Sequence, residues 1–156
     1  MIYKVIIAVL VGFLLSGQMG VAAGDYALPY PGVLPDSPVW IAKDWRDRIV
    51  SWFIFDKEKK AQYYLFLADK RLAAGKMLSD FGQTDLGRKT FESADWFLKK
   101  AAADAESIGA DKLLAQISLA ANKNYEVTGK EDVVNWVRKL FERRLEKFAS
   151  PSAAQK

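Results

Sequence analysis

Apolar residues recur at every third or fourth position over most of the chain after residue 37. This spacing gathers them on one side of an α-helix, and no segment shows the every-second-residue alternation that is typical of strands. The most regular stretch, 84–108, repeats at Phe91, Ala94, Leu98, Ala101, Ala105 and Ile108. Its three alanines favour a close, near-parallel neighbouring helix. The pattern therefore predicts an all-α fold.

Capping residues and glycines mark the ends of the first helices. Ser37 is expected to cap a helix over 38–53, because a serine oxygen can accept from the free amides of a new helix. Asp56 is expected to cap a second helix, which Gly82 then stops. Gly75 lies inside this second helix, where a glycine usually indicates close packing against a neighbour.

The last part of the helical region allows two interpretations. A fourth helical segment opens at Asp111, and Thr128-Gly129-Lys130-Glu131 has the form of a capping box, with Thr128 capping and Glu131 answering three residues later. The residues after this box form either a separate helix or the continuation of one kinked helix. Either way, the sequence predicts a small antiparallel bundle of four or five helices with short connections.

Two flanking stretches differ from this helical domain, which spans 38–149. Residues 24–37 contain three prolines and no helical period, and proline fixes its own φ angle and disfavours helix in the residue before it. An extended, Pro-rich arm is therefore expected ahead of the bundle. Residues 150–156 are small and polar, and a disordered tail is expected there.

The first 23 residues have the pattern of a signal peptide. Lys4 supplies a positive charge, an apolar run covers 5–15, and the small residues Val21-Ala22-Ala23 follow. The alternative is an uncleaved membrane anchor, but the run is shorter than the roughly 20 residues that a spanning helix needs. The chain has no cysteine, so a lipid-anchored lipoprotein is excluded. We expect an exported protein, either periplasmic, associated with the cell envelope or secreted.

Composition excludes much of the usual chemistry. The chain has no histidine and no cysteine, which rules out disulfides, Ser-His-Asp and Cys-His nucleophile systems, and zinc sites built on those ligands. No acidic cluster has the spacing of a calcium loop, so no metal and no cofactor are expected. A net charge of +4 is too mild, and the basic residues too mixed with acids, for nucleic-acid binding. No enzyme activity is expected.

The first helix carries a notable share of the aromatic residues. Trp40, Trp45 and Trp52 all lie on it, and an aromatic stripe at helical spacing usually faces the core. The alternative is an exposed stripe that, with nearby arginines, lies at a membrane interface or grips a polymer. The candidate interaction residues are Tyr30, Trp40, Trp45, Arg46, Arg48 and Trp52.

Three short motifs also resemble a known family. They are Leu34-Pro35-Asp36-Ser37-Pro38, Phe55-Asp56-Lys57-Glu58 and Leu67-Ala68-Asp69-Lys70-Arg71-Leu72. Together they resemble an uncharacterised family of exported bacterial helical domains, catalogued as a domain of unknown function. The likeness covers about residues 26–74. It implies an extracytoplasmic bacterial protein with no assigned activity, in which the shared positions are structural. Ion pairs between helices are expected from Arg46, Arg48, Glu58, Asp69 and Arg71.

Two functional hypotheses follow. The first is a non-catalytic extracytoplasmic domain that binds a protein or another cell-envelope component. The second is a peripheral membrane or lipid-binding domain that uses the tryptophan-rich first helix.

Overall fold

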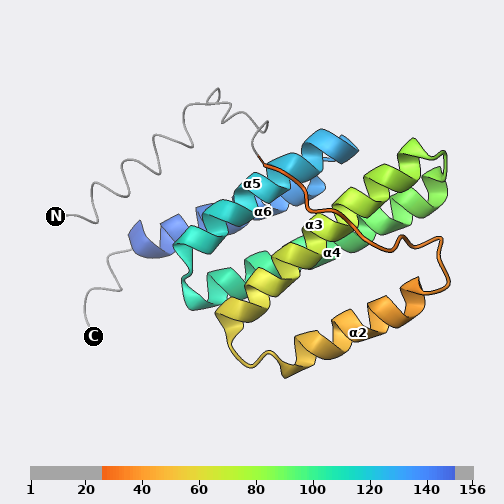
Figure 1. Cartoon of the computed structure of the whole chain (residues 1–156). Coiled ribbons are helices and arrows are strands. Elements are labelled where there is room, and N and C mark those ends of the chain that lie inside the picture. The colour runs from red at the N-terminus through yellow and green to blue at the C-terminus, as the bar shows by residue number, and fades with distance from the viewer. Residues whose placement is uncertain (1–25, 150–156) are drawn as a thin grey trace.

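The computed structural model describes residues 26–149, with side chains to residue 146. Within that range the chain forms five α-helices and no strand (Figure 1). They are α2 (Trp40–Phe53), α3 (Lys57–Asp80), α4 (Thr84–Ile108), α5 (Asp111–Thr128) and α6 (Asp132–Ala149). The predicted all-α bundle is confirmed. The predicted signal segment and C-terminal tail lie outside the described residues.

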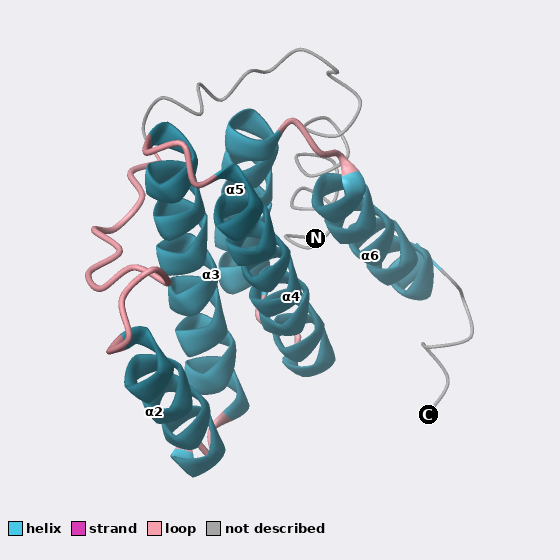
Figure 2. Cartoon of the chain, turned by 90° about the vertical axis from the view of Figure 1, so that its right-hand side faces the viewer, coloured by secondary structure: helices cyan, strands magenta, loops and turns pink. Residues whose placement is uncertain are grey.

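Helices α3 and α4 form a long antiparallel hairpin that organises the rest of the domain (Figure 1). Helices α5 and α6 pack against this hairpin, while α2 approaches α3 alone among the described helices. Figure 2 shows the consequence, with α2 and α6 at opposite sides of the molecule. The fully buried core side chains come from α3 to α6 and include Leu72, Leu78, Leu98, Leu114, Ile117, Val133 and Leu140.

Two glycines allow the close approach of α3 and α4. A Cβ added at Gly75 would lie 2.6 Å from the Phe91 ring and 3.1 Å from the Gly87 carbonyl oxygen. A Cβ at Gly87 would lie 3.0 Å from the Gly75 carbonyl oxygen. A Cβ at Gly87 would also clash with the Ser79 hydroxyl oxygen, so neither position accepts a side chain without movement of its neighbours. The expectation that Gly75 marks close packing is confirmed.

The predicted start of the second helix and the predicted ends of the second and third helices agree with the structure. The Asp56 side chain accepts from the Lys59 amide at 3.0 Å, which satisfies one of the free N–H groups at the start of α3. Gly109 follows α4 and Gly129 follows α5, each with a positive φ of about 70°. Glycine adopts this left-handed conformation without the steric penalty of a side chain.

Two predicted caps are wrong. Helix α2 begins at Trp40, two residues later than expected, and Ser37 makes no cap hydrogen bond to it. The Ser37 carbonyl oxygen accepts from the Trp40 amide in the turn that leads into α2. Thr128 is the last residue of α5, and its hydroxyl donates to the Asn124 carbonyl oxygen at 2.8 Å. The sequence at 128–131 therefore separates two helices, with Gly129 ending the first.

Candidate functional site

Helix α2 has the reverse of the usual orientation, with its polar side toward α3 and its apolar side toward solvent. Asp47 and Ser51 are buried, whereas Trp45 is 64% exposed and Trp52 is 74% exposed. The expectation that the tryptophan stripe faces the core is therefore wrong for these two residues. Trp40 is half-buried at the end of the helix nearest the arm.

The polar side of α2 meets a single buried arginine of α3. One guanidinium nitrogen of Arg71 lies 2.8 Å from Asp44 and 3.7 Å from Asp47. The guanidinium carbon lies 4.1 Å from the centre of the Trp40 ring, a cation–π distance. The Arg71 side chain is only 4% exposed. We call these four residues, Trp40, Asp44, Asp47 and Arg71, the arginine hub.

Electrostatics explains why the hub turns the polar side of α2 inward. Burial lowers the pKa of Arg71, and the neighbouring Asp44 carboxylate opposes that effect. An arginine nevertheless stays protonated in proteins, so its buried charge requires an anionic partner. Were α2 to place its tryptophans against α3, Arg71 would lose both carboxylates. In the observed orientation Arg71 keeps both carboxylates, while the indole rings of Trp45 and Trp52 stay exposed.

The opposite side of α2 forms an exposed apolar surface, which we call the outer face. It consists of Ile41, Trp45, Ile49, Trp52 and Phe53, all of them exposed.

Two arginines border this surface. By helical spacing, Arg46 and Arg48 stand at its two edges, and their side chains are 66% and 70% exposed. Their carboxylate partners point to the hub: Arg46 lies 2.9 Å from Asp47, and Arg48 lies 3.1 Å from Asp44. The outer face therefore presents apolar groups flanked by positive charge.

The Pro-rich arm also contacts α2 and helps to hold it in place. Lys43 donates to the Pro31 carbonyl oxygen at 2.8 Å and lies 4.7 Å from the Trp40 ring centre. Figure 1 shows the arm running across α3 before it turns into α2. The predicted candidate Tyr30 lies in this arm and is 75% exposed, whereas the other five candidates lie on α2.

At its start the arm makes a second buried polar contact. The Tyr26 hydroxyl donates to Asp69 at 2.7 Å. Burial raises the pKa of the Asp69 carboxyl to about 6, and the hydrogen bond from Tyr26 opposes that rise. Burial also raises the pKa of Tyr26. Each group is a hydrogen-bond partner of the other, and the pair fastens the start of the arm to α3.

Of the residues expected to pair between helices, Arg71 does so, whereas Arg46 and Arg48 pair within α2 and Asp69 bonds to the arm. Sequence reasoning missed Asp44 and Asp47 as its partners. A signal was present, because Arg71 lies on the apolar stripe of α3, three residues after Ala68 and four before Gly75. A charge in such a stripe requires a buried partner of opposite sign.

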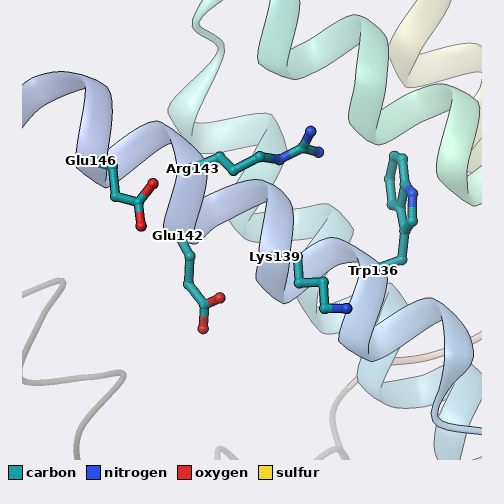
Figure 3. Close-up of a pocket in the computed structure, with 5 residues that line it drawn as sticks. All are labelled: Trp136, Lys139, Glu142, Arg143 and Glu146. Carbon is teal, nitrogen blue, oxygen red and sulfur yellow. The ribbon is translucent and has the colours of Figure 1, made fainter.

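A shallow hollow of about 420 Å³ lies along α6 (Figure 3). The described residues that line it, Trp136, Lys139, Glu142, Arg143 and Glu146, all come from this one helix. Figure 3 shows their side chains spread along the helix surface, with no convergence on one point. Alternating acids and bases on a solvated helix face give no catalytic arrangement.

Within residues 26–149, no three acidic side chains lie together in a way that would hold a metal ion. No helix in this range is long and apolar enough to cross a membrane.

Residues 32–138 match the model of a protein family described as Domain of unknown function (DUF5667). No curated protein and no solved structure matches the chain. The matched range includes α2, the arginine hub and the α3–α4 hairpin.

Proposed function

The chain belongs to the DUF5667 family, a domain of unknown function, and from that premise we propose that it acts as a non-catalytic docking domain outside the cytoplasm. The proposal assigns the binding surface to the outer face of α2. The α3–α6 core serves as the scaffold that displays it.

The orientation of α2 carries this proposal. A monomeric protein rarely exposes several large apolar side chains together, and such a surface usually marks an interaction site. Trp45 and Trp52 are also of the residue type that dominates binding energy at interfaces. The buried hub is the reason these rings remain outside, since Arg71 holds the opposite side of the helix against α3.

The predicted signal segment supports the extracytoplasmic part of the proposal. The non-catalytic part is supported by the lack of histidine and cysteine, and by the dispersed charges along the α6 hollow.

The test measures whether the domain is retained in the cell envelope. The full chain is expressed in a bacterial host, and protease treatment of spheroplasts reports whether the domain is outside the cytoplasmic membrane. The envelope and soluble fractions of three forms are then compared: the wild type, a Trp45→Ser/Trp52→Ser variant and a matched Phe66→Ser/Phe81→Ser control. The control removes two exposed aromatic rings that are not part of α2.

We expect the wild type and the control to be protease-accessible and retained, and the tryptophan variant to move to the soluble fraction. Circular dichroism of each purified form confirms that the helices persist. A chain protected in spheroplasts contradicts the export. Equal retention of the tryptophan variant contradicts docking through α2.

A further inference from the structure

We infer that the outer face of α2 docks on the surface of an anionic lipid bilayer. This inference rests on the proposed function, because it names the occupant of the same surface.

The shape of the surface favours a bilayer. The apolar side chains lie along one 14-residue helix at the side of the molecule, and among the helices of residues 26–149 only α3 contacts α2. A helix that lies in the membrane interface needs this arrangement, with an apolar side that enters the headgroup and acyl boundary and a polar side turned away. Here the polar side faces α3, where Asp44 and Asp47 pair with Arg71, so docking through the outer face leaves these carboxylates in place.

The charge around the surface selects an anionic occupant. Arg46 and Arg48 border the apolar side chains and are largely exposed, whereas the side chains of Asp44 and Asp47 are 27% and 4% exposed and face Arg71. The acids of α2 thus neutralise buried charge, while its exposed charges are positive. Basic groups at a membrane surface are attracted by anionic headgroups.

The same two arginines disfavour a second copy of this chain as the occupant. They lie in the middle of a helix that spans residues 40–53. Whether two copies pair parallel or antiparallel through the outer face, the central arginines of both come together at its edges. Like charges so placed repel, and no exposed acid of α2 is available to offset them.

The position of α2 in the chain agrees with a membrane-surface site. The predicted signal segment ends at residue 23, and α2 begins at Trp40. A connection of this length spans at most about 60 Å when fully extended. If the segment is retained as an anchor, this connection keeps α2 within reach of the bilayer surface.

The test uses the purified full chain and vesicles of phosphatidylcholine, with or without phosphatidylglycerol. The acyl chains are brominated, so that they quench tryptophans which reach them. Mass spectrometry first establishes whether the N-terminal segment is present. Co-sedimentation is measured for the wild type, Trp45→Ser/Trp52→Ser, Arg46→Gln/Arg48→Gln and the Phe66→Ser/Phe81→Ser control.

We expect the wild type and the control to bind vesicles that contain phosphatidylglycerol far more tightly than vesicles of phosphatidylcholine alone. The tryptophan variant is expected to lose about tenfold or more in binding. The arginine variant is expected to lose about fivefold per arginine, and added salt should reproduce that loss. A Trp45→Phe/Trp52→Phe variant should still bind, but with much less quenching, because the other three tryptophans lie away from the outer face.

Absence of wild-type binding to anionic vesicles overturns the inference, as does unchanged binding of the tryptophan variant. The second result would assign the binding to a retained N-terminal segment. If the tryptophan variant loses envelope retention although the wild type does not bind vesicles, docking through α2 stands, and its occupant is a protein or a wall polymer.

Discussion

The guanidinium of Arg71 lies 2.8 Å from the carboxylate of Asp44, and this contact joins α3 to α2 with the arginine side chain only 4% exposed. Asp47, equally buried, lies 3.7 Å from the same nitrogen. A buried charge without its partner costs far more than an exposed one. The orientation of α2, and with it the exposure of Trp45 and Trp52, depends on this pairing.

Replacing the buried arginine tests that dependence. Arg71→Met leaves Asp44 and Asp47 facing an apolar side chain, and we expect a loss of about 3 kcal/mol in the free energy of unfolding. Urea denaturation followed by circular dichroism measures it. Arg88→Met is the control, since Arg88 forms only exposed pairs with Asp85 and Glu92, and it should change stability by less than about 1 kcal/mol. A loss for Arg71→Met as small as the control's would contradict the role of the hub.

The buried carboxyl of Asp69 predicts a pH dependence. Its folded-state pKa of about 6 lies above the ordinary value of 3.8, so the folded protein binds the proton more tightly than the unfolded chain. The contribution of Asp69 to stability is therefore largest below about pH 4 and is lost as the pH rises through 6. We expect Asp69→Asn to be more stable than the wild type at pH 8 by about 1–3 kcal/mol.

Near pH 3 this pH-dependent difference should largely vanish, because Asp69 is then mostly protonated in both states. Thermal unfolding between pH 3 and pH 8 gives the difference directly, and the titration of other carboxyls cancels in it. Glu92→Gln, at an exposed position on α4, serves as the control and should show no such trend. A difference that stays constant with pH would argue against a raised pKa at Asp69.

The close contact at Gly75 predicts a coupling with Phe91. Gly75→Ala gains about 1 kcal/mol in helix propensity, but its Cβ would lie 2.6 Å from the Phe91 ring and 3.1 Å from the Gly87 carbonyl oxygen. We expect a net loss of about 1–3 kcal/mol from overpacking. In a Phe91→Ala background the loss should shrink by at least about 1 kcal/mol, because the ring is gone. Additive effects in this double-mutant cycle would contradict the contact.

The N-terminal cap of α3 predicts the smallest of these changes in stability. Asp56→Ala removes the acceptor of the Lys59 amide and should cost about 1 kcal/mol, a typical value for a helix cap. Asp56→Asn keeps an acceptor oxygen and should cost much less. Thermal melts of the three forms measure both effects, and a melting temperature unchanged in the alanine variant would remove the capping role.

The sequence by itself determined the features that depend on neighbouring residues. Helical spacing predicts α3, α4 and α5, and Gly82 and Gly109 mark the ends of the first two of these helices. The cap at Asp56 was equally readable. These signals are local, because a helix end is set by hydrogen bonds and φ angles within a few residues. Thr128 was wrongly predicted to cap a helix, because the same sequence can form a helix cap or the last turn of a helix.

Only the tertiary structure decided which side of α2 faces inward. The sequence shows an apolar stripe with Trp45 and a polar stripe with Asp44 and Asp47, and burial of the apolar one is the usual outcome. The orientation of α2 depends on Arg71, which lies 27 residues after Asp44 in the chain, because its buried charge needs an anionic partner. The contact of Tyr26 with Asp69 is similarly remote. Such long-range pairings have no local signature, and they are what expose the outer face of α2.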